Sequence, residues 1–561
     1  MKQARPDRVI CGVTGPPLAA PRPQRVFDTT RALAYEAGMR LAFLVAICIC
    51  AGTVLTPAQD FDLLLRGGRV ADGTGNPAVF ADVAVRGGRI AAVGRVSGTA
   101  KRVVDVKGLV VAPGFVDTHT HAEGIEDQPL AENFLRMGVT TLVLGNCGGS
   151  RLNLADYFKE LEATNISPNV CSLIGHNTVR RQAMGGSFLR PPTDAELTKM
   201  KGYVEQAMKD GAVGLATGLI YLPGTFAKTE EIVELAKVAG ADGGIYVSHM
   251  RSEGEGIYKA LDELFRIARE GGMRGHISHI KLTGKNAWGQ TGKVFAAIEQ
   301  ARASGLDITQ DQYVYPASST GLSQLIPDEA REGGAEKFRE RLADPKQKAD
   351  IVKRMKASLH KQGRDDYAYA VIANYSKDKS LNGLNVVEAA KKKRGGDSLD
   401  EQIELVLDIE KSGGASAVFH GMSEDDLREF AKHPNTMFAS DSGVRKFGEG
   451  VPHPRGYGNN ARVLGEYVRE LKLLRLEDAV RRMSSLPATT FKLKDRGFIR
   501  EGAWADLAVF DPAQVTDKAT FKEPHQYAIG FKLVTVNGVV VIEDDKHLGT
   551  RPGKVIRMNQ Q

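Results

Sequence analysis

The middle of the chain alternates short apolar runs with longer segments in which apolar residues recur at helical spacing. The strand-like runs TTLVLG, GAVGLAT, GIYVSHM and GHISHIKL are followed by the helical patterns LADYFKELEAT, TEEIVELAKVAG, GIYKALDELFRIARE and GKVFAAIEQARAS. Strands and helices that alternate in this way predict an α/β protein with a parallel sheet. Because the alternation recurs about eight times, residues 117–490 are predicted to form a TIM (β/α)8 barrel.

Both ends of the chain carry a different pattern, with short strands and few helices. Residues 59–116 contain DLLLRGGRV, ADVAVRGGRIAAVG and RVVDVKGLVVAPG. Residues 491–561 contain ADLAVFD and FKLVTVNGVVVIED, the second with an Asn-Gly hairpin signal. We expect these two segments to pair into one small β-sandwich domain. Residues 327–415 interrupt the barrel pattern with a Lys-rich, helix-favouring stretch, which is too long for a plain loop and predicts an inserted helical subdomain over the barrel mouth.

A strongly apolar segment lies near the N-terminus. Met39-Arg40 is followed by LAFLVAICICAGTVL and then by TPAQD. A short positive start, an apolar run of this length and a small residue before the mature chain are typical of a secretory signal. The run is shorter than the roughly 20 residues of a transmembrane helix, so no stable membrane anchor is expected. We therefore expect residues 1–58 to be a leader cleaved near Ala58, and the protein to be periplasmic or secreted.

The residues before Met39 are rich in Pro and Arg, which indicates a mis-assigned start; a disordered tail and a transit peptide are the alternatives. Three of the five cysteines, at positions 11, 48 and 50, lie in the leader. The expected mature chain keeps only Cys147 and Cys171, so it has no disulfide framework. Cys171 lies in an apolar strand and is predicted to be a small core residue.

Composition and charge place the chain among ordinary globular proteins. The 561 residues are 42% hydrophobic and 25% charged, which argues against disorder. The formal net charge is +7, but the leader, with seven Lys or Arg against three Asp or Glu, carries more than half of it. No basic stripe with interleaved aromatic residues stands out in the rest of the sequence. A nucleic-acid partner is therefore not expected.

The segment VVAPGFVDTHTHAEG carries the first candidate chemistry. An apolar run ends in an acid and two histidines, His119 and His121. Residues two apart on a strand point to the same face, so the two imidazoles converge, and converging neutral imidazoles suit a transition metal such as zinc. A pair of ordinary core or surface histidines is the alternative.

Other metal-type residues follow further apolar strands. Cys147 follows TTLVLGN, His249 follows GGIYVS, His279 follows RGHIS, and Asp441 follows TMFAS. In a parallel barrel all strands end on one face, where active sites are built. Together with the two histidines above, these residues predict one metal centre. Each residue alone has a structural explanation, as a core histidine, a buried thiol or a capping aspartate.

These motifs together resemble a known family. PGFVDTHTH, GNCG, GLATGLIYLPGTFA, IYVSHMRSEG, HISHIKLTG, ASDSG and HPRGYG are similar to those of the N-acyl-D-amino-acid deacylases (D-aminoacylases) of the amidohydrolase superfamily. The resemblance runs from about Phe61 to Arg557. It departs in two places: ASDSG has serine where relatives often have glycine, and residues 444–451 form a slightly longer segment.

The resemblance implies a zinc site and a reaction. It implies one tightly bound zinc held by Cys147, His249 and His279. A second, weaker divalent metal would be held by His119 and His121, bridged by the thiolate of Cys147 and touched by Asp441. The implied reaction is hydrolysis of the amide bond of a small N-acyl-D-amino acid.

Amide hydrolysis also needs a proton acceptor and a residue that binds and orients the substrate. Asp441, close to the metal, can take a proton from water and return it to the leaving nitrogen. By resemblance, Arg455 holds the substrate carboxylate, which a guanidinium matches in bidentate fashion. Lys281 and Tyr313 are candidate substrate-binding helpers or structural residues, and His176 is a candidate for fixing a loop.

Two other functions fit parts of the pattern. A cyclic-amide hydrolase of the hydantoinase or dihydroorotase kind shares the barrel and PGFVDTHTH, but GNCG disfavours it because those enzymes bridge their metals with a modified lysine. A barrel without activity, kept for binding, is disfavoured because every metal-type residue is present. A zinc assay beside a hydrolysis screen separates the three.

Overall fold

The structure is a computed structural model in which residues 60–558 are described. The predicted export signal and the three N-terminal cysteines lie outside these residues. Within the described part, no helix has both the length and the apolarity that crossing a bilayer would require.

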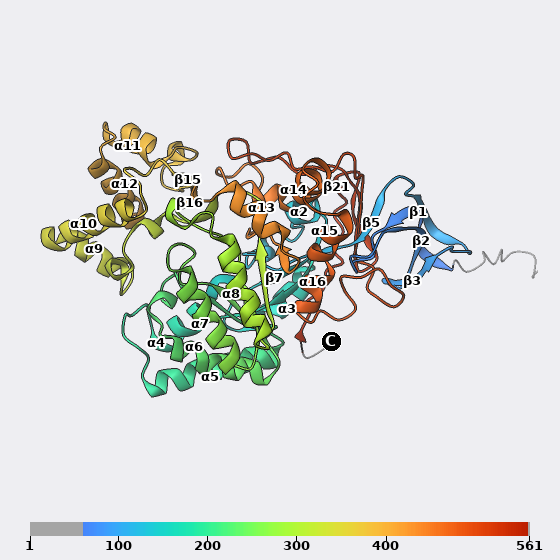
Figure 1. Ribbon diagram of the computed structural model, residues 1–561, viewed down its shortest axis with the longest axis horizontal. Coiled ribbons are helices and arrows are strands. Elements are labelled where there is room, and N and C mark those ends of the chain that lie inside the picture. Colours follow the sequence, from blue (N-terminus) through green and yellow to red (C-terminus); the bar gives the residue numbers. More distant parts are fainter. Residues whose placement is uncertain (1–59, 559–561) are drawn as a thin grey trace, which may run out of the picture. The chain divides into compact units, whose positions relative to one another are not determined.

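Eight parallel strands close into a barrel (Figure 1). One sheet has the order β17-β13-β12-β11-β10-β9, and a second sheet, β6-β7-β8, completes the barrel. Strands β8 and β9 are two parts of one barrel strand. The Val213 amide donates to the Ser172 carbonyl at 2.9 Å, which joins the sheets on one side, and Thr120 and Ser442 form a parallel bridge on the other. The predicted TIM barrel is confirmed. Its strands are β6 (Phe115–Asp117), β7 (Val139–Leu144), β8 (Asn169–Ser172), β9 (Ile174–Gly175), β10 (Gly214–Gly218), β11 (Ile245–His249), β12 (Arg274–Ile277), β13 (Ile308–Gln312) and β17 (Thr436–Phe438).

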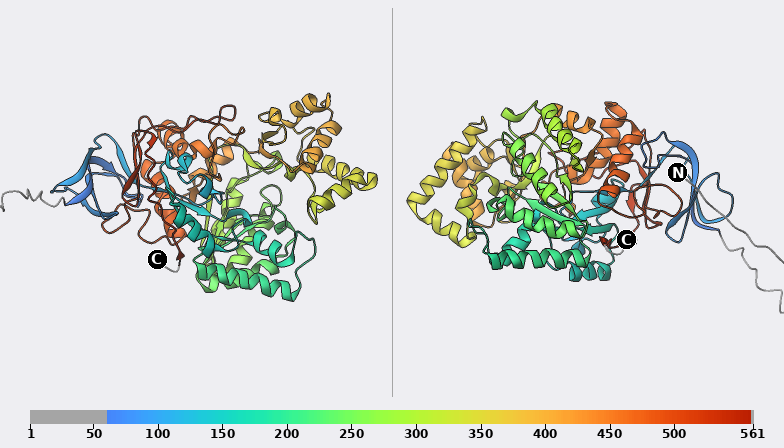
Figure 2. Two further views of the ribbon diagram at one scale, coloured as in Figure 1. Left: turned by 180° about the vertical axis from the view of Figure 1, so that it is seen from behind. Right: turned by 60° about the horizontal axis from the view of Figure 1, so that its bottom comes forward.

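Helices cover the outside of the barrel strands (Figure 2). In α7, for example, Ile257, Leu261 and Leu264 recur at helical spacing and are buried in the main core. Helix α5 begins with a capping box between Thr193 and Glu196. The helices outside the insert are α2 (Glu132–Leu135), α3 (Leu154–Thr164), α4 (His176–Met184), α5 (Asp194–Asp210), α6 (Thr229–Ala241), α7 (Ile257–Glu270), α8 (Thr291–Ala303), α13 (Glu424–Lys432), α14 (Arg455–Arg462), α15 (Leu476–Met483) and α16 (Ser485–Thr490).

The insert has a hydrophobic core of its own and contains a sheet as well as helices. Strand β16 pairs antiparallel with both β14 and β15. The helix-favouring composition of residues 327–415 predicted the helices but not this sheet, because β14 and β16 lie outside those bounds and the three short strands are far apart in the sequence. The elements are β14 (Ser318–Gly321), α9 (Ala335–Ala343), α10 (Pro345–Lys361), β15 (Ala370–Asn374), α11 (Val386–Arg394), α12 (Leu399–Lys411) and β16 (Ser416–Phe419).

Strands from both ends of the chain share one nine-stranded sheet. Strand β18 pairs antiparallel with β5, with Leu507 opposite Pro113. A bulge between Leu65 and Gly68 divides β1, so that its first half pairs with β4 and its last residues pair with β5. The strands are β1 (Phe61–Val70), β2 (Val79–Arg86), β3 (Arg89–Gly94), β4 (Ala100–Asp105), β5 (Val110–Pro113), β18 (Leu507–Phe510), β19 (Phe531–Val536), β20 (Val539–Glu543) and β21 (Lys546–His547).

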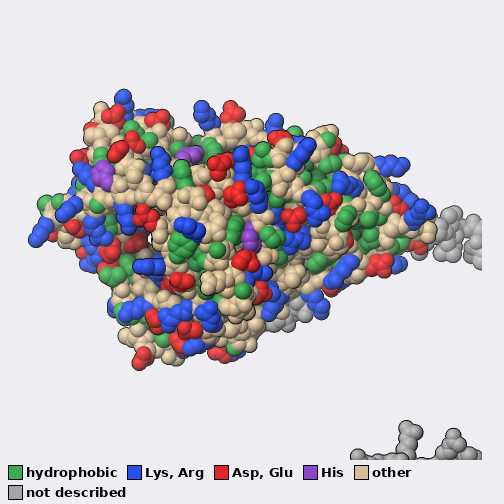
Figure 3. All heavy atoms as spheres, viewed as in Figure 1, with side chains coloured by type: hydrophobic (Ala, Val, Ile, Leu, Met, Phe, Trp, Pro, Cys, Tyr) green, Lys and Arg blue, Asp and Glu red, His purple; other side chains and the backbone are tan. Residues whose placement is uncertain are grey.

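Charged side chains of both signs are interspersed over the face of the molecule seen in Figure 3. Polar residues also occur in the barrel interior, where they are buried at the strand ends. His119 and Asp311 are fully buried, and His249, His279 and Asp441 are nearly so. Burial of this many ionisable groups is costly unless they are paired or bind an ion.

Candidate metal centre

Five barrel strands bring the six predicted metal-type residues together. His119 and His121 follow β6, Cys147 follows β7, His249 ends β11, His279 follows β12, and Asp441 follows β17. They form three overlapping groups in which all candidate ligand atoms lie within 4.8 Å of one another. The groups are His119 with His121 and Cys147, Cys147 with His249 and His279, and His119 with His279 and Asp441.

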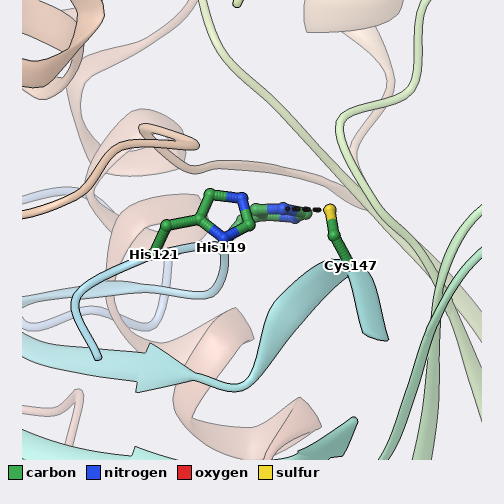
Figure 4. A group of neighbouring side chains, drawn as sticks. All are labelled: His119, His121 and Cys147. Carbon is green, nitrogen blue, oxygen red and sulfur yellow. Dashed lines mark hydrogen bonds between the residues drawn. The ribbon is translucent and has the colours of Figure 1, made fainter. Parts of the chain in front are cut away.

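The Cys147 sulfur lies at the middle of the cluster. It is 3.2 Å from His119 Nε2, 3.6 Å from His249 Nδ1 and 3.8 Å from His279 Nε2. Figure 4 shows the His119 ring pointing at this sulfur, with the His121 ring beside it. Burial, followed by the charge of Asp441, raises the pKa of the Cys147 thiol well above its ordinary value. A cation is therefore needed to hold this sulfur as a thiolate.

The donor set fits a zinc ion. One sulfur and several imidazole nitrogens are the ligands that zinc prefers. Burial lowers the pKa of His119 to about 3, so its imidazole is neutral and free to coordinate. Two buried imidazole nitrogens, His119 Nδ1 and His249 Nε2, have no hydrogen-bond partner within the described residues. Buried polar atoms without a partner call for an explanation, and a bound ion or an ordered water is one.

Three of the six residues have left-handed backbone conformations. The φ angles are 52° at Cys147, 34° at His279 and 50° at Asp441. Such conformations cost on the order of 1–3 kcal/mol each for residues other than glycine and cluster at functional sites. Each one turns the chain sharply at a strand end, so that the side chain faces the cluster. The strain was not predictable from the sequence.

Asp311, on β13, holds several parts of the centre and was not predicted. It accepts hydrogen bonds from the His279 amide at 2.6 Å, from Thr118 at 2.9 Å and from His276 Nε2 at 2.8 Å. Its Oδ2 also lies 3.8 Å from His119 Nδ1. Burial would raise the pKa of Asp311, but these histidines lower it to about 2. The carboxylate therefore stays ionised and fixes two of the predicted ligands. Its place inside a buried strand, ITQDQ, was the available signal.

Glu253 is a second buried carboxylate that the sequence did not reveal. Its Oε1 lies 2.8 Å from His279 Nδ1 and 2.5 Å from Lys281 Nζ. The bond to Nδ1 leaves His279 Nε2 facing Cys147, which is the orientation that a ligand requires. Asp117 fixes the backbone near the cluster, because it accepts hydrogen bonds from the amides of His119 and Ser440 at 3.1 Å.

Asp441 and Arg455 form an ion pair beside the cluster. Arg455 Nη1 lies 2.9 Å from Asp441 Oδ2, while Asp441 Oδ1 lies 3.2 Å from His121 Nε2. Burial alone would raise the pKa of Asp441, but the charges of Arg455 and His119 bring it well below its ordinary value. Asp441 is therefore an ionised proton acceptor at the edge of the cluster.

The remaining predicted residues differ in their distance from the cluster. The Tyr313 ring lies beneath both cations, 4.3 Å from the guanidinium carbon of Arg455 and 5.6 Å from Lys281 Nζ. Lys281 is engaged with Glu253 and lies 2.7 Å from His279 Nδ1. His176 belongs to none of the three groups, and its Nε2 lies 2.9 Å from Glu231.

A cavity of about 290 Å3 is lined both by loops of the barrel and by the insert. Glu253 and Met422 line it from the barrel side, and Tyr369 and Phe419 line it from the insert. The six candidate ligands do not line this cavity, and Glu253, which lines it and contacts His279, connects it to the cluster.

A closed barrel with a thiol, imidazoles and an ionised aspartate at its strand ends defines a metal-dependent hydrolase. Residues 102–542 match the family described as "Amidohydrolase family". The chain is 36% identical over 526 residues to the D-aminoacylase of Alcaligenes xylosoxydans xylosoxydans, covering 89% of this chain and 98% of that protein. The chain therefore belongs to the amidohydrolase family and, within it, to the group that contains the D-aminoacylases.

Solved structures agree with this assignment. The N-acyl-D-glutamate deacylase of Bordetella bronchiseptica, complexed with zinc and a phosphonate mimic of the tetrahedral intermediate, is 33% identical with a TM-score of 0.76, covering 89% of this chain and 99% of that one. A D-aminoacylase with a binuclear metal centre is 35% identical with a TM-score of 0.77, covering 89% and 100%. A D-hydantoinase is only 14% identical, with a TM-score of 0.51, and shares the fold alone.

Proposed function

We propose that this protein is a zinc-dependent hydrolase that cleaves N-acyl-D-amino acids into a D-amino acid and a carboxylate. The observation that carries the proposal is the buried Cys147 sulfur among three imidazoles, beside the ion pair of Asp441 and Arg455. The choice of linear amides and of the D configuration rests on the relatives, which are D-aminoacylase and N-acyl-D-glutamate deacylase.

The metal would be held by residues of this chain in two groups. Cys147, His249 and His279 would hold the tightly bound zinc, and His119 and His121, with Cys147 and Asp441, would contribute to a second, weaker site. A bound zinc ion supplies Lewis acidity, since it polarises a carbonyl and makes water acidic enough to lose a proton near neutral pH. Asp311 holds the His279 backbone amide, and Glu253 orients the His279 imidazole for this task.

The proton transfers are assigned to Asp441. Its carboxylate is ionised and buried at the edge of the cluster, so it can accept the proton of the attacking water. Returning that proton to the amide nitrogen turns the nitrogen into a good leaving group. The same group thus acts first as a base and then as an acid.

Arg455 is assigned to the substrate carboxylate. Its side chain is buried, and its Nε has no hydrogen-bond partner within the described residues. A guanidinium with a free N–H edge can bind a carboxylate through charge-assisted hydrogen bonds. The Tyr313 ring supports the guanidinium from one side, and Lys281 lies on the same ring.

The test pairs the two cysteines of the described chain. Cys147→Ala should lose the tightly bound zinc and the hydrolysis of N-acetyl-D-amino acids. Cys171→Ala is the matched control, because this thiol is fully buried in another core cluster and does not belong to any of the three ligand groups. Metal analysis and a hydrolysis panel of N-acetyl-D-amino acids, N-acetyl-L-amino acids and hydantoins give the readout. Full zinc and activity in Cys147→Ala, or hydrolysis of hydantoins alone, would contradict the proposal.

Export is a separate part of the proposal. The apolar run after Met39-Arg40 and the small residues near Ala58 support a cleaved signal peptide and a periplasmic or secreted enzyme. N-terminal sequencing of the protein from extracytoplasmic fractions should begin near residue 59. A mature protein that starts at Met1 or Met39 would refute export by cleavage.

A further inference from the structure

The cavity beside the metal centre is lined by two charged residues, and they differ in how well they are paired. Glu253 is neutralised by Lys281 at 2.5 Å and is also bonded to His279 at 2.8 Å. Arg364, in the loop that follows α10, has no carboxylate partner within residues 60–558. The neighbouring Asp365 side chain is fully exposed and lies 4.0 Å from His360 instead.

Arg364 is held in place by an aromatic ring and a backbone carbonyl, without a carboxylate from the described part of the chain. Its guanidinium carbon lies 3.9 Å from the centre of the Tyr369 ring, and its Nη2 donates to the His420 carbonyl at 3.2 Å. The Tyr369 ring fixes the plane of the guanidinium, and the single hydrogen bond to the His420 carbonyl leaves the other N–H groups of this five-donor fork available within the described residues. Tyr367 and Phe419 provide apolar walls in the same cavity, and such walls strengthen a charge–charge interaction.

Two residues that line the cavity connect it to the candidate metal centre. Glu253 touches the ligand His279, and Met422 accepts a hydrogen bond from Tyr313, which lies under Arg455. A substrate whose carboxylate is held by Arg455 would therefore have this cavity, with Arg364 in its wall, available to a second substituent.

We propose that Arg364 binds a second carboxylate of the substrate, so that this enzyme prefers dianionic N-acyl-D-amino acids. This inference rests on the proposed function and names its substrate class. The second carboxylate belongs either to an acidic amino-acid side chain or to a dicarboxylic acyl group, because an N-acyl amino acid can carry an extra carboxylate on either of these two substituents. The relatives leave the class open, since a D-aminoacylase and an N-acyl-D-glutamate deacylase are similarly identical to this chain.

The first experiment compares three substrates in the zinc-loaded enzyme. N-acetyl-D-glutamate carries the extra carboxylate on the side chain, N-succinyl-D-leucine carries it on the acyl group, and N-acetyl-D-leucine carries none. In Arg364→Gln, the ratio of kcat/KM for one acidic substrate to that for N-acetyl-D-leucine should fall about 10- to 100-fold, as expected for losing hydrogen bonds to a charged group. The acidic substrate whose ratio falls identifies the source of the carboxylate.

Two controls separate recognition from folding. Arg394→Gln removes an arginine of the same insert that is paired with Asp408 at 2.8 Å, and it should leave the substrate ratio unchanged. Arg364→Lys keeps the charge without the planar fork and should give an intermediate ratio. An unchanged ratio for both acidic substrates in Arg364→Gln would overturn the inference.

A binding measurement keeps the inference independent of turnover. Calorimetry in the Asp441→Asn background should show that Arg364→Gln weakens binding of one acidic substrate about 10- to 100-fold. If the wild-type enzyme hydrolyses none of the three substrates but Arg364→Gln still loses affinity for an acidic one, the proposed function is wrong and the carboxylate site at Arg364 is supported. If N-acetyl-D-leucine is hydrolysed and neither ratio nor affinity responds to Arg364, the inference alone fails.

Discussion

Asp311→Asn should weaken the metal centre from a position outside the candidate ligand groups. The aspartate accepts three hydrogen bonds, from the His279 amide, from Thr118 and from His276. An asparagine can keep one acceptor for the His279 amide, but its NH2 group then faces the other two donors. Two bonds to a charged acceptor are lost, at about 1.5–3 kcal/mol each. The Thr118 hydroxyl can rotate and accept from the new NH2 group, so we expect a net loss of about 3 kcal/mol in the free energy of unfolding.

The effect on zinc should be separable from the loss of stability. His279 has a left-handed φ of 34°, and the hydrogen bond of its amide to Asp311 helps to hold this conformation. Losing groups that orient metal ligands typically costs about 10- to 100-fold in metal affinity. Urea unfolding measures the stability, and competition with a chelator measures zinc affinity under conditions where the variant is folded.

Asp307→Asn provides the matched control for Asp311. Asp307 lies just before the same strand, but its side chain is half exposed and pairs with Arg274 at 2.6 Å. A surface pair of this kind contributes about 0–1 kcal/mol, and it lies far from the strand ends that carry the ligands. Equal zinc affinity in Asp311→Asn and Asp307→Asn would refute the reasoning.

Two further substitutions test the roles of buried carboxylates. Asp441→Asn should lower kcat at least about a hundredfold while Cys147 and its histidines keep zinc; near-normal kcat would exclude the proton-transfer role. The same change leaves buried Arg455 without its partner, so stability should fall by about 3–5 kcal/mol, more than loss of a helix cap would cost. Burial would raise the pKa of Glu231, but His176 and Arg180 bring this pKa below its ordinary value. The ionised carboxylate therefore stabilises the fold at pH 7, and this stabilisation is lost as the pH falls below about 4.3. Glu231→Gln should lower the free energy of unfolding at pH 7 by about 3–5 kcal/mol. Urea unfolding at several pH values should also show a smaller loss of stability below about pH 4.3 than in the wild type; an equal loss would contradict this role.

The barrel was predictable because its signals are local. Several barrel strands, such as β7 and β11, are apolar runs followed by a helical pattern, and the ends of parallel strands share one face. His119, Cys147 and Asp441 could therefore be placed together without knowing the path of any loop. Their actual proximity in the structure follows from the same topology.

The groups that surround the candidate ligands could not be predicted in this way. Glu253 reaches His279 from the loop that follows another strand, and its contact depends on the path of that loop. Arg364 meets the cavity only because the insert folds over the barrel mouth, with β14 and β16 paired across almost a hundred residues. Such long-range contacts leave no periodic trace in the sequence.

The shared sheet of the two chain ends has a consequence for the order in which the protein can fold. Strand β5 is hydrogen-bonded to β18, which is synthesised roughly 390 residues later, and at about 5–20 residues per second the ribosome needs roughly 20–80 seconds to deliver it. During this interval the edge of β5 lacks its neighbour, and an unpaired edge invites pairing with other chains. The nascent chain therefore depends on being shielded or kept extended until its last strands emerge.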